Sequence, residues 1–80
     1  MDPKAVEALI RAGLPGAEVT VTGDGSHFEA VVISPEFAGK SPLAKQRLVL
    51  ASVNAEIKSG ELHALSIKTF TPAEWAAQPD

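Results

Sequence analysis

Residues 60 to 75, Gly-Glu-Leu-His-Ala-Leu-Ser-Ile-Lys-Thr-Phe-Thr-Pro-Ala-Glu-Trp, carry the strongest structural signal in the chain. Gly60 is typical of the position that ends a helix, because glycine adopts a left-handed backbone without steric cost. Apolar and polar side chains alternate from 62 to 70, which predicts a strand with His63 at its beginning. Thr71-Pro72-Ala73-Glu74 has the capping-box pattern that starts a new helix. These residues therefore predict a helix end, a strand and a helix start in succession.

The N-terminal third predicts one helix and a hairpin. Asp2 fits the cap of a helix over residues 3–12, where apolar residues recur at helical spacing. Alternating residues predict antiparallel strands over 17–22 and 27–34. The turn between them, Gly23-Asp24-Gly25-Ser26, contains glycines that suit positive backbone φ.

A connecting loop at 35–40 leads to a second helical segment. Ser41 resembles a helix cap followed by proline, and the run 43–58 predicts one long helix or two shorter ones. Its expected apolar stripe consists of Leu43, Val49, Leu50, Val53 and Ile57.

The order of these elements predicts a single α+β domain over residues 1–80. Its order is α-β-β-α-β-α, with a three-stranded mixed sheet and the helices packed on one face. Two neighbouring strands joined by a helical crossover normally run parallel, so their N-terminal ends share one edge of the sheet. Those ends carry His27 and His63. We therefore expect both histidines at one rim of the domain.

Composition narrows the possible functions. The 80 residues contain no cysteine, so the chain has neither a disulfide, nor a thiol nucleophile, nor a thiolate ligand of its own. This favours a reducing compartment, and we expect a cytoplasmic protein because no signal-peptide or membrane-spanning run is visible. A net charge of −3 disfavours a generic nucleic-acid binder, which needs a basic surface.

The sequence predicts that the chain is not an enzyme. Its serines lack the context of an activated nucleophile, and its carboxylates are scattered. Gly39-Lys40-Ser41 resembles the end of a phosphate-binding P-loop, but that motif requires glycine where this chain has Ser34. Ser41 is better explained as a helix cap, with Lys40 as a solvated charge beside it.

The two histidines amount to half of a metal site. Tetrahedral zinc takes about four protein ligands, or three and a water. Asp24 or Glu61 would add an oxygen, but their spacing does not indicate a closed site. A pair of imidazoles is what one partner contributes when a second protein supplies the remaining ligands.

Each histidine also has a structural alternative. His27 follows a turn and is expected, on that alternative, to be an exposed residue that bonds to its own turn. The structural alternative for His63 is a position at the edge of the core, on the face of Leu65 and Ile67.

Two segments resemble the BolA family. Phe37-Ala38-Gly39-Lys40-Ser41 with Arg47-Leu48-Val49 resembles the family signature F-x-G-x-S-x-x-x-R-x-R. Leu62-His63-Ala64-Leu65-Ser66-Ile67-Lys68 resembles the C-terminal strand, with the family histidine at His63. The Gly-Asp-Gly-Ser-His-Phe turn and the Thr-Pro-Ala-Glu-Trp tail are similar to the short bacterial IbaG-like branch. The resemblance covers nearly the whole chain.

The resemblance implies a fold akin to the class II KH domain and a partner, a monothiol (CGFS-type) glutaredoxin. In that pair a bridging [2Fe–2S] cluster is held by the glutaredoxin cysteine, by glutathione and by the BolA protein. His63 matches the family's C-terminal ligand, and His27 matches the histidine of the variable loop. The implied role is iron–sulfur trafficking or sensing, linked to stress. The chain alone is expected to be a monomer without a bound cluster.

One departure concerns a basic segment. The family signature often reads Arg-His-Arg where this chain has Lys45-Gln46-Arg47, as in the IbaG-like branch. Some BolA relatives are described as DNA-binding regulators, which makes DNA the alternative partner. Lys40, Lys45 and Arg47 would form a small basic contact cluster for DNA, a glutaredoxin or glutathione carboxylates. The G-x-x-G clamp of nucleic-acid-binding KH domains is not evident, and no membrane partner is expected.

Overall fold

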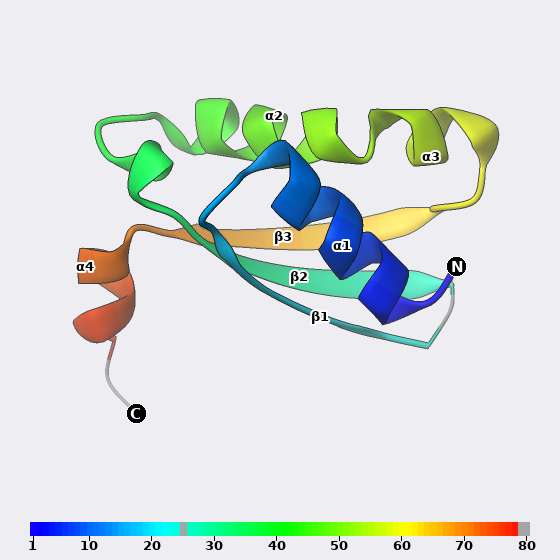
Figure 1. The fold of residues 1–80 in the computed structure, drawn as a ribbon, viewed down its shortest axis with the longest axis horizontal. Coiled ribbons are helices and arrows are strands. Elements are labelled where there is room, and N and C mark those ends of the chain that lie inside the picture. The colour runs from blue at the N-terminus through cyan, green and yellow to red at the C-terminus, as the bar shows by residue number, and fades with distance from the viewer. Residues whose placement is uncertain (25, 79–80) are drawn as a thin grey trace.

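The computed structural model describes residues 1–24 and 26–78, which form one three-stranded sheet flanked by helices (Figure 1). The elements in chain order are α1 (Pro3–Gly13), β1 (Glu18–Gly23), β2 (His27–Ile33), the 3-10 turn η1 (Pro35–Phe37), α2 (Pro42–Ser52), α3 (Asn54–Ser59), β3 (Ala64–Phe70) and α4 (Pro72–Ala76). The predicted α+β order is confirmed. The expected loop at 35–40 contains η1, and the segment 43–58 forms two helices.

The sheet is mixed and has the order β1-β2-β3. β1 and β2 are antiparallel, whereas β2 and β3 are parallel, with His27 opposite Ala64 and Ile33 opposite Phe70. The prediction that the second and third strands are parallel neighbours in the sheet is therefore confirmed. β3 begins at Ala64 and not at residue 62, because the backbone N–H of Leu62 donates to the carbonyl of Glu56 and does not enter the sheet.

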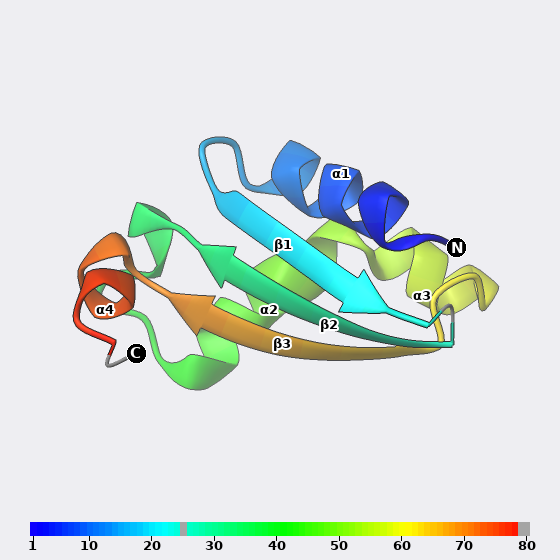
Figure 2. The ribbon, with the colours of Figure 1, turned by 90° about the horizontal axis from the view of Figure 1, so that it is seen from below.

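The helices are distributed unequally over the sheet. α1, α2 and α3 cover one face, and the other face stays open, as the two perpendicular views show (Figures 1 and 2). α4 lies at the end of the sheet where β2 and β3 finish. The open face carries the alternate strand residues that do not point into the core. In residues 1–24 and 26–78, no helix is long and apolar enough to span a membrane.

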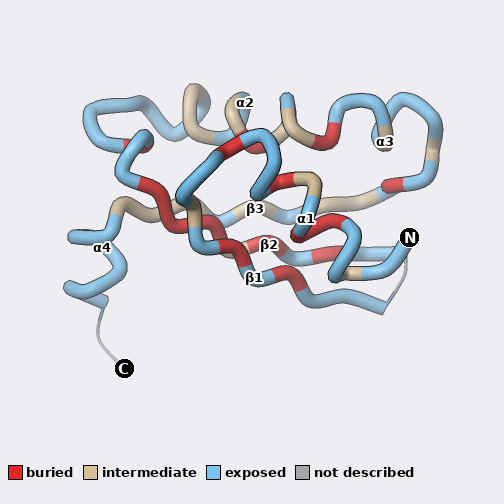
Figure 3. The backbone as a smooth tube through the Cα atoms, in the orientation of Figure 1, coloured by how far each residue is buried: buried red, intermediate tan, exposed pale blue. Residues whose placement is uncertain are grey.

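The core lies between the sheet and the helices α1 and α2 (Figure 3), and α3 contributes no buried residue to it. Its buried members are Val6, Ile10, Leu14, Val19, Val21, Phe28, Ala30, Val32, Phe37, Val49, Val53 and Leu62. The predicted stripe on 43–58 is correct at Val49 and Val53 and wrong at both ends, since Leu43 is 59% and Ile57 40% exposed. Leu43 points about 120° round the helix from Val49. Ile57 lies beyond the break at Val53, which ends α2 and precedes α3.

The predicted helix boundaries are confirmed by their hydrogen bonds. The carboxylate of Asp2 accepts from the N–H of Lys4 at 2.7 Å, and Ser41 Oγ accepts from the N–H of Ala44 at 3.2 Å. Gly60 ends α3 with φ of 84°. These caps satisfy N–H groups that have no partner inside the helix.

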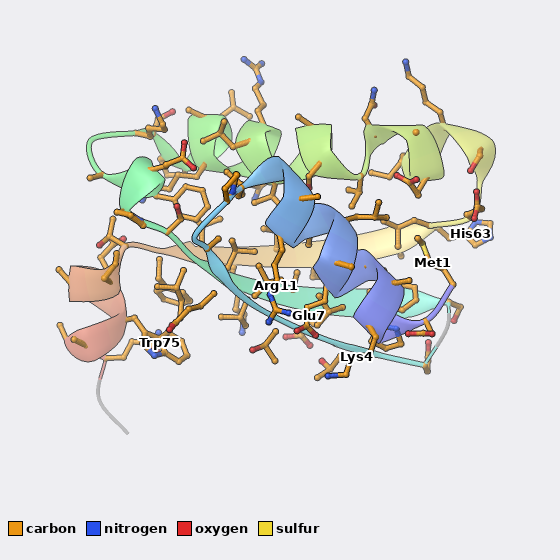
Figure 4. The ribbon with its side chains drawn as sticks, in the orientation of Figure 1. Met1, Lys4, Glu7, Arg11, His63 and Trp75 are labelled. Carbon is orange, nitrogen blue, oxygen red and sulfur yellow. The ribbon has the colours of Figure 1, made fainter. Side chains whose placement is uncertain are left out.

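The outer edge of β1 is occupied by a side chain of α1. Arg11 Nη2 donates to the carbonyl oxygen of Val19 at 3.2 Å and lies 2.8 Å from Glu7 Oε1, one turn earlier (Figure 4). The Glu7 side chain is only 11% exposed. The hydrogen bond from Arg11 joins the first helix to the strand beside it and occupies an acceptor that would otherwise be unpaired, while Glu7 holds the guanidinium in place.

Candidate functional site

His63 lies between α3 and β3 and is exposed. Leu62, the residue before it, is 1% exposed and is anchored by its bond to Glu56. The buried leucine fixes the backbone, and His63 projects at the end of the molecule where α3 connects to β3 (Figure 4). The alternative of a histidine at the core edge is therefore wrong, although Leu65 and Ile67 do pack against the core.

His27 is the first residue of β2, and it is also exposed. Its neighbour Phe28 is buried, so strand alternation directs the imidazole to the open face. There Nε2 lies 3.4 Å from Ser66 Oγ of β3, at the long limit of a hydrogen bond. The expected bond between His27 and its own turn exists for the backbone, while the ring reaches across to β3.

The turn before His27 is held by one carboxylate. Asp24 Oδ1 accepts from the N–H of Ser26 at 3.0 Å, from Ser26 Oγ at 3.1 Å and from the N–H of His27 at 2.9 Å. The bond from His27 is the largest of the causes that lower the pKa of Asp24 to about 2. The predicted positive φ is not found at Gly23, and Gly25 lies outside the described residues.

The parallel register brings the two histidines to the same end of the sheet. His27 is opposite Ala64, so His63 lies one residue beyond the paired position. We call His27 and His63 the histidine rim. In the described ranges, no group of three or more His, Cys, Asp or Glu side chains is placed to hold a metal ion. Asp24 is engaged in the turn, and Glu61 Oε1 accepts from Ser59 Oγ at 3.2 Å. The rim therefore places two exposed imidazoles at one end of the sheet.

The predicted basic cluster is divided between two surfaces. Lys40 and Arg47 line a hollow of about 330 Å³ at the start of α2, together with the exposed Leu43. The side chain of Lys45 is only 15% exposed, and its Nζ lies 3.8 Å from Glu74 Oε1 of α4. The expectation of one three-residue contact surface is wrong, because Lys45 points toward α4 while the other two line the hollow.

Sequence reasoning missed two features of the surface. The Glu7–Arg11 pair has the i, i+4 spacing of a helical ion pair, which was the available signal. The second feature is Trp75, whose ring meets Phe70 edge-on at 5.2 Å. However, Trp75 remains 45% exposed and borders a second hollow.

Comparison with known proteins assigns the chain to a family. Residues 11–74 match the family model described as BolA-like protein. The acid stress protein IbaG of Escherichia coli strain K12 is 38% identical over 76 residues, which cover 95% of this chain and 90% of that protein. This chain is a member of the BolA-like protein family.

Solved structures agree with this assignment. A bolA protein homologue from Coxiella burnetii has a TM-score of 0.86 and 39% identity, over 95% of this chain and 97% of that one. The BolA domain of SufE1 from Arabidopsis thaliana has a TM-score of 0.71 and 32% identity, over 90% and 93% of the two chains. The expected fold and the resemblance to the IbaG-like branch are thereby confirmed.

Proposed function

We propose that this chain is a non-enzymatic partner of a monothiol glutaredoxin and completes a shared, glutathione-assisted [2Fe–2S] cluster. The observation that carries the proposal is the parallel register of β2 and β3, which puts both histidines at one exposed end of the sheet. His63 is the principal ligand in this proposal, and His27 assists. The role is cluster trafficking, or sensing of iron or redox state.

The residues present fit such a cluster. Both imidazoles are exposed, and the 3.4 Å contact of His27 with Ser66 is weak enough to be exchanged for a metal bond. Histidine ligation in place of thiolate raises the potential of a [2Fe–2S] cluster. The chain contributes two nitrogens, and the glutaredoxin and glutathione contribute the sulfurs.

The residues next to the histidine rim position these two nitrogens. The Asp24 turn holds the backbone of His27, and the buried Leu62 holds that of His63. Ligands on a fixed backbone lose little conformational freedom when a metal binds. Because a ligating imidazole must be unprotonated, retention of the cluster is expected to weaken as the pH falls through the range in which histidine titrates.

Visible circular dichroism of a reconstituted mixture tests the proposal. The chain is mixed with a monothiol glutaredoxin, glutathione, iron and sulfide, and the wild type is compared with His27→Ala and His63→Ala. Lys58→Ala, an exposed change on α3, is the matched control. We expect a spectrum distinct from that of the glutaredoxin homodimer, altered strongly by His63→Ala and less by His27→Ala. A spectrum unchanged in His63→Ala contradicts the proposal.

DNA binding is the second candidate, and it rests on the hollow lined by Lys40 and Arg47. In residues 1–24 and 26–78 neither cation forms an ion pair. This function predicts binding that weakens steeply with salt and is lost in Lys40→Ala/Arg47→Ala. A flat salt titration excludes it.

A further inference from the structure

A second hollow lies at the opposite end of the sheet from the histidine rim, near α4. Its volume is about 230 Å³. Its lining residues are Gly16, Glu18, Ile33, Pro35, Pro72 and Trp75. We call it the Trp75 hollow. It is below the roughly 300–1,000 Å³ of sites that enclose a whole small ligand, and so its size suits one side chain.

The Trp75 ring is fixed at this place from two sides. α4 begins with a complete capping box, in which the N–H of Thr71 donates to Glu74 Oε1 at 2.8 Å and the N–H of Glu74 donates to Thr71 Oγ1 at 3.1 Å. Phe70 meets the indole edge-on, at 5.2 Å and 65°. Figure 4 shows Trp75 extending from α4 toward the sheet. The ring is thus both oriented and 45% exposed.

A carboxylate shares this hollow with the indole. Glu18 is opposite Ile33 on β1 and β2, and Ile33 is opposite Phe70 on β2 and β3. These three residues therefore form one row across the open face, and Trp75 packs against the Phe70 end. Glu18 is exposed and makes no ion pair within the described part of the chain.

This combination selects the charge of its ligand. An aromatic face attracts a cation, and a carboxylate beside it adds a charge-assisted hydrogen bond. The apolar floor of Ile33 and the proline walls suit an alkyl stem. Anions are disfavoured by Glu18 and by the net charge of −3. Arginine matches best, because its planar guanidinium stacks on an indole and binds a carboxylate with two N–H groups.

We propose that the Trp75 hollow binds an arginine side chain of a partner polypeptide, with the guanidinium on the indole and paired with Glu18. The hollow lies at the finishing ends of β2 and β3, and the histidine rim lies at their starting ends. A partner held here therefore leaves the rim free. The proposal stands independently of the glutaredoxin function.

Fluorescence of the chain tests this directly. Trp75 is the only tryptophan and tyrosine is absent, so the emission reports on this hollow alone. The probe is the blocked peptide acetyl-Gly-Arg-Gly-amide, and its neutral counterpart contains citrulline in place of arginine. We expect a saturable change in Trp75 emission with the arginine peptide and no saturation with the citrulline peptide. The nitrogen and carbon chemical shifts of Glu18 and Ile33 should move with the arginine peptide.

Two variants separate the specific site from general attraction to an acidic chain. Glu18→Gln is expected to lower the affinity for the arginine peptide about three- to tenfold. Glu56→Gln makes the same charge change on α3 at the other end of the molecule, and is expected to leave the affinity unchanged. Equal weakening by both variants, or equal response to arginine and citrulline, overturns the proposal. Emission that changes with protein concentration in the absence of peptide assigns the hollow to a second copy and also overturns it.

Discussion

The ring of Phe28 fills the space beside Gly23, its cross-strand partner in the β1–β2 hairpin. A Cβ built on Gly23 would lie 2.6 Å from Cδ1 of Phe28 and 2.5 Å from the carbonyl oxygen of His27. Glycine is needed here for close approach and not for a positive φ. The fully buried Phe28 ring and the backbone of the histidine rim therefore depend on the absence of one methyl group.

Gly23→Ala is expected to lower the free energy of unfolding by about 1–3 kcal/mol, because the added methyl forces the hairpin or the Phe28 ring to shift. Urea unfolding followed by circular dichroism measures this loss. Thr22→Ala, which changes the exposed neighbour, is the control and should have a small effect. A Gly23→Ala variant whose urea unfolding midpoint equals that of the wild type would show that the hairpin accommodates the methyl group without loss of stability.

Asp24→Asn is expected to change the acid sensitivity of the fold. Because hydrogen bonds hold the folded pKa of Asp24 at about 2, below its usual 3.8, the carboxylate stabilises the folded chain. That contribution is complete above about pH 4 and is lost as the pH falls toward 2. The variant should therefore show a shallower loss of stability between pH 4 and 2.

Two measurements check the role of Asp24. Urea midpoints at several pH values compare the slopes of the wild type and of Asp24→Asn. A carbon NMR titration of the Asp24 carboxyl should give a midpoint near 2 in the folded chain. Parallel stability profiles for the two proteins would refute this account of the turn.

Arg11→Met is expected to destabilise the chain by about 1–2 kcal/mol. The substitution keeps an apolar stem but leaves the nearly buried Glu7 carboxylate without its partner and the Val19 carbonyl without a donor. The Arg11 side chain is 55% exposed, so solvent already screens part of the ion pair. A double-mutant cycle with Glu7→Gln isolates the pair, and additive losses would mean that the two charges do not interact.

Thr71→Ala is expected to cost about 1 kcal/mol and to loosen α4, because it removes the hydroxyl oxygen that accepts from the N–H of Glu74 and leaves only the backbone half of the capping box. The Trp75 emission should shift to the red as its contact with Phe70 weakens. Thr69→Ala, a nearby threonine outside the cap, is the control. An unchanged emission maximum in Thr71→Ala would show that Phe70 alone orients the indole.

Local signals were enough to predict most of the fold. Asp2, Ser41, Gly60 and Thr71 mark helix ends through hydrogen bonds or backbone angles that depend on adjacent residues only, and each was predicted correctly. The rim also followed from sequence, because a helical crossover between neighbouring strands allows one direction for β3. His27 and His63 could be brought together without knowing any side-chain contact.

Features that depend on tertiary contacts were not predictable. The exposure of Leu43 depends on how α2 is rotated over the sheet, and the engagement of Lys45 depends on where α4 packs. Gly23 was assigned to backbone conformation because the position of the Phe28 ring is invisible in the sequence. Glu18 and Trp75 line one hollow because of two strand registers and a helix, and no local pattern encodes this arrangement.

The parallel pairing of β2 and β3 makes the rim a property of the folded state alone. An antiparallel hairpin can bring its paired residues together locally. His27 and His63, in contrast, reach one end of the sheet only after the intervening helices have packed and the long segment between β2 and β3 has closed into a loop. A metal cluster that is bound by both imidazoles would therefore bind the native chain and not the denatured one. Its binding energy would be added to the stability of the fold, and a destabilised chain would release it.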